Sequence, residues 1–102
     1  MFHTENKILN DSHGFKLKDR VKTVCKIYAG LQKNQKTRLT PIPCESVGQI
    51  RSIEQIKVDN HYAITYYLVL FHIDQGLNKH GGKKKPLCFW AKLNESCFVK
   101  YG

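Results

Sequence analysis

The sequence predicts an all-β fold, a small barrel of five strands with a long basic loop after the first strand. Short stretches rich in β-branched and aromatic residues recur along the chain, several with apolar and polar residues in alternation. Turn-forming Gly, Pro, Asn and Asp residues separate these stretches. A chain of 102 residues has room for one hydrophobic core. We therefore expect a flexible lead-in over residues 1–14 and one β-barrel domain over residues 15–102.

The first strand is predicted over Phe15–Ile27, where apolar residues alternate with cations. Successive side chains of a strand point to opposite faces, so an extended segment here is apolar on one side and cationic on the other. The loop that follows contains Gly30 and two prolines, Pro41 and Pro43. The cationic side carries Lys16, Lys18, Arg20 and Lys22.

The segment Val47–Ile56 fits two structures. Its apolar residues are spaced by three, which suits a helix. Gly48 at its start and its β-branched content favour a strand with a bulge near Ser52. We predict the strand and keep the helix as the alternative.

The remaining strands are easier to place. The clearest strand covers Tyr62–Ile73, and a basic hairpin connection follows it. The segment Leu87–Leu93 alternates, so Phe89 should face inward while Cys88 and Trp90 face outward. A short turn and a last strand, CFVKY, complete the barrel. The predicted core contains Phe15, Leu17, Val21, Ile50, Ile64, Leu68, Leu70, Phe89 and Leu93.

The order of these motifs resembles that of SH3-like small barrels over about residues 15–101. FKLKDRV resembles their first strand, with Lys18 where these barrels usually carry Gly before the Asp. VGQIRSI, YYLVLF and FWAKLNESCFVKY resemble their second, third and closing segments. The chain is similar in style to KOW-type domains and to the variable chain of ferredoxin–thioredoxin reductase. The resemblance implies a fold and a broad binding role, because small barrels carry many unrelated functions.

The charge of the chain indicates an anionic partner. Seventeen Lys and Arg against eight Asp and Glu give a formal net charge of +9. Excess charge of this size is typical of proteins that bind polyanions. Basic residues continue from the first strand into the long loop and recur in the later hairpin, so they are predicted to form one patch. Beyond the first strand, the patch would contain Lys26, Lys33, Lys36, Arg38, Lys83, Lys84 and Lys85.

Two aromatic residues lie near this predicted patch. Tyr28 and Trp90 are candidates to stack on unpaired bases. Trp90 has an equally good alternative, packing in a small apolar cluster on the outside of the barrel. The cationic strip also has an alternative role, since charged side chains protect an exposed strand from edge-to-edge pairing.

The sequence gives little support to catalysis or metal binding. GLQKNQKT lacks the second Gly of a phosphate-binding loop, and no acidic pair suggests general acid–base chemistry. The four cysteines, Cys25, Cys44, Cys88 and Cys97, lack the short spacing of zinc ligands. We expect free thiols, no metal and no cofactor.

These features predict a non-enzymatic module that binds nucleic acid, DNA or RNA, through its basic residues. The alternative is an accessory or docking subunit of a larger, possibly redox, assembly with an acidic protein partner. The sequence shows no signal peptide, and its most apolar stretch is too short to span a bilayer. We therefore expect a cytoplasmic protein with no membrane partner.

Overall fold

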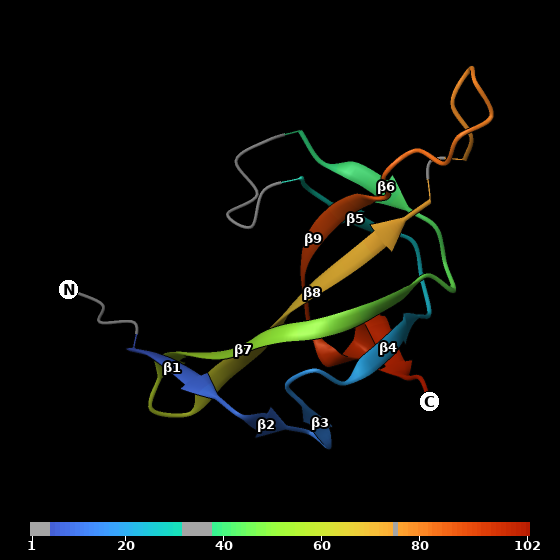
Figure 1. The fold of residues 1–102 in the computed structure, drawn as a ribbon. Coiled ribbons are helices and arrows are strands. Elements are labelled where there is room, and N and C mark those ends of the chain that lie inside the picture. The colour runs from blue at the N-terminus through green and yellow to red at the C-terminus, as the bar shows by residue number, and fades with distance from the viewer. Residues whose placement is uncertain (1–4, 32–37, 75) are drawn as a thin grey trace.

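The structure is a computed structural model that describes residues 5–31, 38–74 and 76–102. This part of the chain is all-β, as the sequence predicted (Figure 1). The long strands β7 and β8 run through the centre of the molecule, and shorter strands lie along both of their sides. The elements are β1 (Glu5–Leu9), β2 (Asp11–Ser12), β3 (Phe15–Lys16), β4 (Arg20–Thr23), β5 (Ile27–Ala29), β6 (Thr40–Ile42), β7 (Val47–Asp59), β8 (Tyr62–Ile73), β9 (Leu87–Leu93), the 3-10 turn η1 (Glu95–Cys97) and β10 (Phe98–Lys100).

The main sheet has the strand order β10-β4-β7-β8-β9, with β1 paired to β7 beside β4. All of its pairs are antiparallel. Two small hairpins, β2–β3 and β5–β6, complete the fold, and β5 approaches β9 through the bridge between Gly30 and Trp90. The hydrogen-bonded sheet does not close into a barrel.

Strand β7 serves two partners along one edge because it carries a bulge. The register against β8 shifts between Ile50 and Ser52, which leaves Arg51 as the extra residue. Before the bulge β7 pairs with β4, and from Ile53 onward it pairs with β1. A bulge bends a strand and increases its twist, so it can direct one strand into two pairings. The sequence prediction of a strand with a bulge near Ser52 is confirmed.

The core lies on one side of the main sheet, which we call the inner face. Edge-to-face contacts join Phe15, Tyr67 and Phe98, with ring centroids 5.7, 4.9 and 5.2 Å apart for the three pairs. Because Phe15 and Phe98 come from β3 and β10, these rings cover the inner face of β8 from two other strands. The buried cluster consists of Val21, Ile27, Ala29, Ile42, Ile50, Ile53, Tyr67, Val69, Phe71, Phe89, Ala91, Leu93 and Phe98.

Gly48 allows the inner face to pack closely. A Cβ atom at this position would lie 2.7 Å from Cγ1 of Val69 and 2.9 Å from Cδ1 of Phe71. Contacts this short do not occur in real proteins, so any larger residue would displace the core side chains of β8. Glycine is therefore required where β7 crosses over this part of the core.

The prediction of one strand over Phe15–Ile27 is wrong. Two strands, β3 and β4, are separated by a turn in which Lys18 has a φ of 72°. The backbone amide of Lys16 donates to Oδ2 of Asp19 at 2.9 Å and stabilises this turn. A left-handed residue reverses the chain locally and ends the alternation of faces. A lysine adopts here the conformation that glycine adopts without steric cost.

Three predicted core residues are placed differently from the prediction. Leu17 is exposed because it lies in the turn, and Ile64 and Leu68 are only half-buried. Phe15 is half-buried and packs against the core. The faces of β8 are the reverse of those predicted, since Thr65, Tyr67, Val69 and Phe71 are the residues that point inward. The burial of Val21, Ile50, Leu70, Phe89 and Leu93 is confirmed.

Strands β7, β8 and β9 cover the segments predicted for them, and the helix alternative for Val47–Ile56 is excluded. The predicted last strand, CFVKY, is shorter, because Cys97 ends the turn η1 and β10 covers Phe98–Lys100. Residues 1–14, predicted to be a flexible lead-in, contribute β1, which pairs with β7 over Glu5–Leu9. This pairing supports the part of β7 that extends beyond β4 (Figure 1). Polar strands of this kind carry little hydrophobic alternation for a sequence pattern to detect.

Candidate nucleic-acid interface

The side of the main sheet opposite the core, which we call the outer face, carries both cationic and aromatic side chains. Alternation along β4, β7, β8 and β9 sends every second residue there, while their neighbours are buried in the core. Leu70 is buried on this side without belonging to the core cluster. The outer face consists of Arg20, Lys22, Gln49, Ser52, Glu54, Tyr66, Leu68, Leu70, His72, Cys88, Trp90 and Lys92.

The strand register arranges these side chains in rows across the sheet. The first row runs from a cation on β4 to an indole on β9, since Arg20 lies opposite Gln49, which lies opposite Leu70, which lies opposite Trp90. In the second row, Leu68 has Ser52 on one side and Lys92 on the other. Each row therefore combines an apolar centre with a cation at one end.

Two shallow hollows flank these rows, one beside each. One has a volume of about 230 Å³ and lies among Ser52, Glu54, Tyr66, Leu68 and Lys92. The other, of about 350 Å³, we call the Arg20–His72 hollow, and it is lined by Arg20, Val47, Gly48, Gln49, Leu70 and His72. Each hollow has a leucine and a basic side chain in its lining, and the smaller one also contains the side chain of Glu54. The Arg20–His72 hollow is therefore the better fit for a ligand that carries a flat ring and a negative charge.

Aromatic rings near this face already hold cations. The Nζ atom of Lys92 lies 5.0 Å from the ring centroid of Tyr66. The guanidinium carbon of Arg20 lies 5.4 Å from the ring of Tyr101, next to β10. A cation held over a ring keeps its charge toward solvent while its side chain stays ordered. These pairs present fixed positive groups.

The four cations of the predicted first strand do not form one strip. Arg20 and Lys22 are on the outer face of β4, whereas Lys16 belongs to β3 and Lys18 lies in the turn. The ammonium group of Lys100 lies 3.5 Å from Oδ2 of Asp19 and adds a further cation beside this turn. The turn therefore divides the predicted strip into two pairs.

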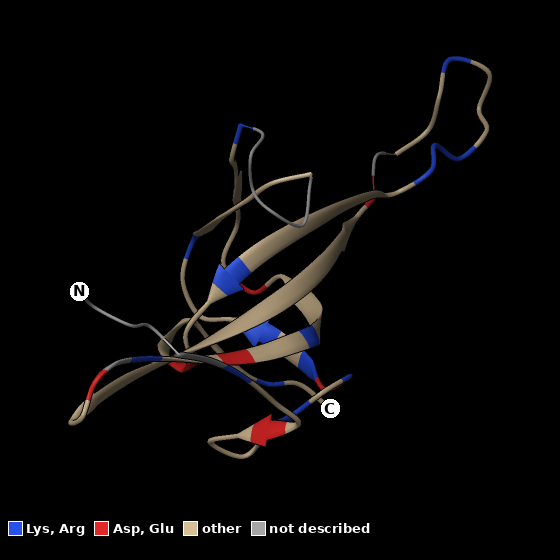
Figure 2. Ribbon diagram, turned by 90° about the vertical axis from the view of Figure 1, so that its left-hand side faces the viewer, with Lys and Arg blue, Asp and Glu red and all other residues tan. Residues whose placement is uncertain are grey.

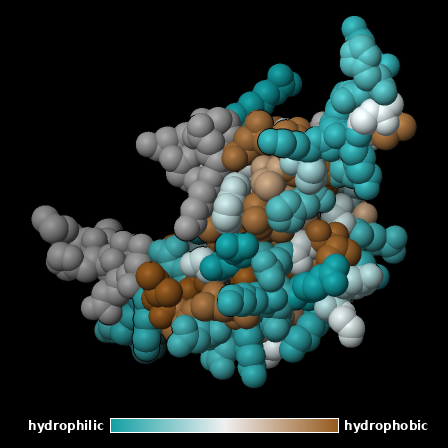
Figure 3. Space-filling view, viewed as in Figure 1, coloured by the Kyte–Doolittle hydropathy of each residue, from teal (hydrophilic) through white to brown (hydrophobic). Residues whose placement is uncertain are grey.

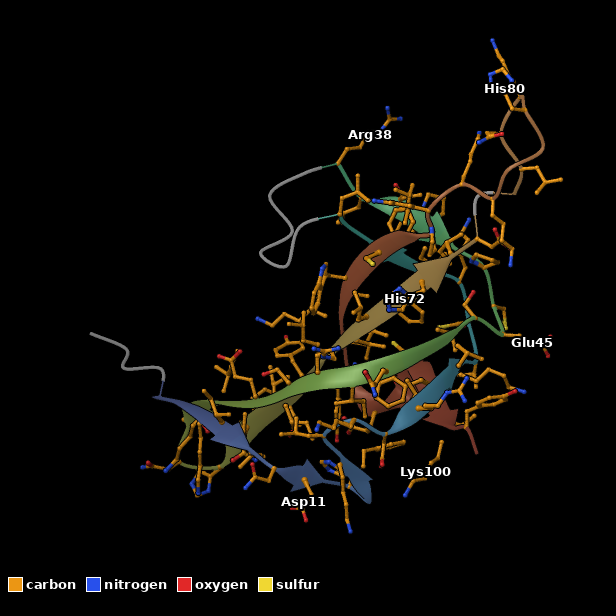
Figure 4. The ribbon with its side chains drawn as sticks, viewed as in Figure 1. Asp11, Arg38, Glu45, His72, His80 and Lys100 are labelled. Carbon is orange, nitrogen blue, oxygen red and sulfur yellow. The ribbon has the colours of Figure 1, made fainter. Side chains whose placement is uncertain are left out.

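The other predicted basic residues lie at the far end of the molecule. In Figures 1 and 2, the hairpin over residues 76–86 and the β5–β6 hairpin lie at the top, and β3 and β4 lie toward the bottom. Figure 4 places Arg38 and His80 at the top and Lys100 at the bottom. Lys83, Lys84 and Lys85 are exposed on the upper hairpin, together with Lys79. One continuous patch is thus replaced by two basic regions, and Lys33 and Lys36 lie outside the described residues.

The two predicted aromatic residues are placed differently from each other. Tyr28 is 54% exposed on β5, with Nζ of Lys26 5.8 Å from its ring centroid. Trp90 is half-buried on the outer face, and its backbone exchanges hydrogen bonds with Gly30 at 2.9 and 2.7 Å. Trp90 thus faces away from Phe89, as the alternation predicted.

Tyr66 and Lys92 were missed as site residues. The alternation of Leu87–Leu93 was enough to put Lys92 on the face of Trp90. To predict Tyr66 as well, one would have to know which residues of β8 face outward, and the sequence did not distinguish the two faces.

The surface of the described residues has no broad apolar area in the view of Figure 3. Hydrophobic residues appear there as several small groups between hydrophilic ones.

No cluster of three His, Cys, Asp or Glu side chains suited to a metal ion occurs among residues 5–31, 38–74 and 76–102. The cysteines are free, with Cys25 and Cys44 exposed and Cys88 and Cys97 half-buried. Desolvation, followed by the neighbouring Cys97 and Cys44, raises the pKa of the Cys25 thiol. Higher thiol pKa values mean less of the reactive thiolate at neutral pH.

No protein-family model, curated protein or solved structure matches this chain. In the described part of the chain there is also no helix with the length and hydropathy needed to cross a bilayer.

Proposed function

We propose that this chain is a non-enzymatic module that binds nucleic acid through the outer face of its sheet. The observation that carries the proposal is that Arg20 and Trp90 share one row of that face, while Lys92 on the same face lies over the ring of Tyr66. Arg20, Lys22 and Lys92 would contact phosphates, and Trp90 and Tyr66 would contact bases. Phosphate contacts supply most of the affinity of such modules and carry little sequence information.

The strand order supports a fold of the SH3-like type. It runs β10-β4-β7-β8-β9, with a 3-10 turn between β9 and β10. Lys18 has a positive φ at the position where these barrels usually carry glycine. We propose that the chain is an open variant of this barrel, in which the rings of Phe15, Tyr67 and Phe98 fill the gap between the outer strands.

Single strands fit the outer face better than duplexes do. Its hollows have volumes of about 230 and 350 Å³, and the lining of each includes a leucine and a basic side chain. Unpaired bases can lie against aromatic side chains, whereas bases in a duplex are stacked on one another. The upper basic hairpin, with Lys83, Lys84 and Lys85, would add contacts to a longer strand that are independent of sequence.

The first experiment measures how affinity depends on salt, with fluorescence anisotropy on single-stranded and duplex probes. The variant Arg20→Gln/Lys92→Gln removes two proposed phosphate contacts, and we expect the log–log slope to fall by about 0.7 for each contact on a single strand. The control variant, Lys7→Gln/Lys57→Gln, removes the same charge from exposed residues of β1 and β7 outside the outer face. Equal effects of the two variants would mean that only net charge matters.

A second experiment tests the aromatic contact. Trp90→Leu keeps an apolar side chain at this position, so the fold should be retained. We expect affinity for single strands to fall by about 1–3 kcal/mol, with little change for duplexes. Unchanged single-strand affinity would favour the packing role of Trp90.

The alternative partner is an acidic protein. It becomes the better explanation if the wild-type protein binds neither kind of probe at low ionic strength. The basic residues of the outer face would then be tested against acidic protein partners by the same pair of charge variants.

A further inference from the structure

A thiol and an imidazole lie side by side on the outer face, where β8 and β9 pair. Cys88 lies directly opposite His72 in the strand register, and its Sγ atom lies 3.3 Å from Nδ1 of the imidazole. This contact is within hydrogen-bonding distance for sulfur. An imidazole that accepts a thiol proton is the arrangement that assists nucleophilic attack by cysteine.

The other thiols have different surroundings. Cys44 is exposed, and its thiol lies 3.8 Å from the backbone carbonyl oxygen of Thr23. Cys25 has the Cys97 thiol as a neighbour, and the Cys97 thiol lies 3.5 Å from Oδ1 of Asn94. Carbonyl and amide oxygens accept a hydrogen bond from a thiol but do not take its proton. In the described part of the chain, Cys88 is the cysteine whose thiol contacts a histidine.

The surroundings of His72 favour a negatively charged reactant. His72 lines the Arg20–His72 hollow, of about 350 Å³, and shares it with Arg20, whose guanidinium carbon lies 5.4 Å from the ring of Tyr101. Besides His72 itself, Arg20 is the only charged or titratable side chain among the residues that line this hollow. Figure 4 shows His72 on β8, far from His80 in the upper hairpin. A small molecule with carboxylates can therefore be held beside His72 by Arg20.

We propose that Cys88 is a modification site that reacts with small anionic disulfides of the glutathione type, with His72 as its general base and Arg20 as the anchor for the carboxylate. The reaction takes place at one end of the outer face and does not require bound nucleic acid.

The thiol–disulfide exchange needs no oxidant or reductant besides the disulfide itself. Nδ1 of His72 takes the thiol proton as Sγ of Cys88 attacks one sulfur of the disulfide. The bond between the two sulfurs of the reactant breaks, and the second sulfur leaves as a thiolate that takes up a proton. The products are a mixed disulfide on Cys88 and one free small thiol. For Nδ1 to accept the proton, the neutral imidazole must carry its own proton on Nε2.

The test follows modification of each cysteine in the intact protein by peptide mass spectrometry after brief exposure to oxidised glutathione. We expect Cys88 to react about tenfold faster than the exposed Cys44, a factor below the hundredfold or more that a base gives in an enclosed active site. Equal rates at Cys88 and Cys44 would overturn the proposal.

Two histidine variants separate base catalysis from packing. His72→Ala should lower the Cys88 rate to that of Cys44, and imidazole added to the solution should restore part of it, because free imidazole can occupy the vacated space. His80→Ala, which changes an exposed histidine in the upper hairpin, should leave the rate unchanged. An unaltered rate in His72→Ala, or a loss that imidazole does not restore, would rule out the role of His72 as a base.

Disulfides of opposite charge test whether Arg20 anchors the carboxylate of the reactant. Cystamine is a disulfide of similar reactivity with cationic ends, so the arginine should not favour it. Arg20→Gln should slow the reaction of Cys88 with oxidised glutathione severalfold and leave its reaction with cystamine unchanged or faster. Equal slowing of both reactions would remove Arg20 from the proposal.

Discussion

The inner and outer faces of β8 carry side chains of similar size, but different parts of the molecule cover them. On the inner face, Tyr67, Val69 and Phe71 lie beneath side chains from other strands and are 0% exposed. On the outer face, Tyr66 and Leu68 stay half-buried and border a shallow hollow. The difference shows that burial is decided here by neighbouring strands, not by the composition of β8. The covered face stabilises the fold, and the other face remains available for a ligand.

Truncating one residue on each face gives the largest expected contrast. Phe71→Ala should lower the free energy of unfolding by about 3–5 kcal/mol, because it leaves a cavity in a fully buried cluster. Leu68→Ala should lower it by about 1 kcal/mol, since a half-exposed side chain loses less contact. Urea denaturation measures both values. Equal losses would show that the outer face is covered by something that the structure does not contain.

Gly48→Ala tests how closely β7 approaches the inner face. The new methyl group would lie 2.7 Å from Cγ1 of Val69, so the core must shift, at a cost of about 1–3 kcal/mol. Gly82→Ala is the control, because its nearest atom belongs to the flexible side chain of Asn78 at 3.1 Å. The prediction fails if both variants have the same midpoint in thermal unfolding.

The pH dependence of stability tests the environment of the Tyr67 hydroxyl, the polar group at the edge of the inner face. The hydroxyl of Tyr67 donates to the carbonyl of Ser12 at 3.0 Å, and desolvation raises its pKa despite this bond. A raised pKa means that the unfolded chain ionises first, so stability is complete below about pH 10 and decreases as the pH rises further. Tyr67→Phe should cost about 1 kcal/mol at neutral pH through the lost hydrogen bond, and its stability should fall less steeply in alkali. Parallel curves for the two proteins would mean that other groups cause the alkaline loss.

The smallest expected effect concerns the turn that sets which residues of β4 point outward. Lys18→Gly should stabilise the protein by about 0.5–1 kcal/mol, because glycine adopts a φ of 72° without a clash. Lys16→Gly, in β3, should instead destabilise it, since that residue is extended. A loss of stability in Lys18→Gly would show that the lysine side chain contributes more than its strained backbone costs.

The sequence predicted where the strands lie better than which way their side chains point. β8 and β9 have the predicted bounds, and the bulge in β7 is at the predicted place. β-branched and aromatic content marks a strand whatever its surroundings. Alternation also assigned Trp90 to the outer face.

Such a pattern could not predict which residues of β8 face the core. Ile64, Tyr66 and Leu68 are as apolar as the residues between them, so hydrophobicity favoured neither side. The sequence also did not predict the left-handed conformation of Lys18, because lysine rarely adopts it. These two features separate the predicted basic strip from the site that we propose. The first depends on rings from β3 and β10, and the second on how β3 and β4 pack.

The pairing of β10 with β4 has a consequence for how quickly the protein folds. Phe98 lies opposite Thr23, so most of the chain separates two neighbouring strands. The chain loses much conformational entropy before this pairing provides any stabilisation, and β folds rich in such contacts reach the native state in milliseconds to seconds. Until then β4 has an unpaired edge that other chains can bind. Slow refolding, with aggregation that rises with protein concentration, is the expected behaviour, and stopped-flow fluorescence of Trp90 would record it.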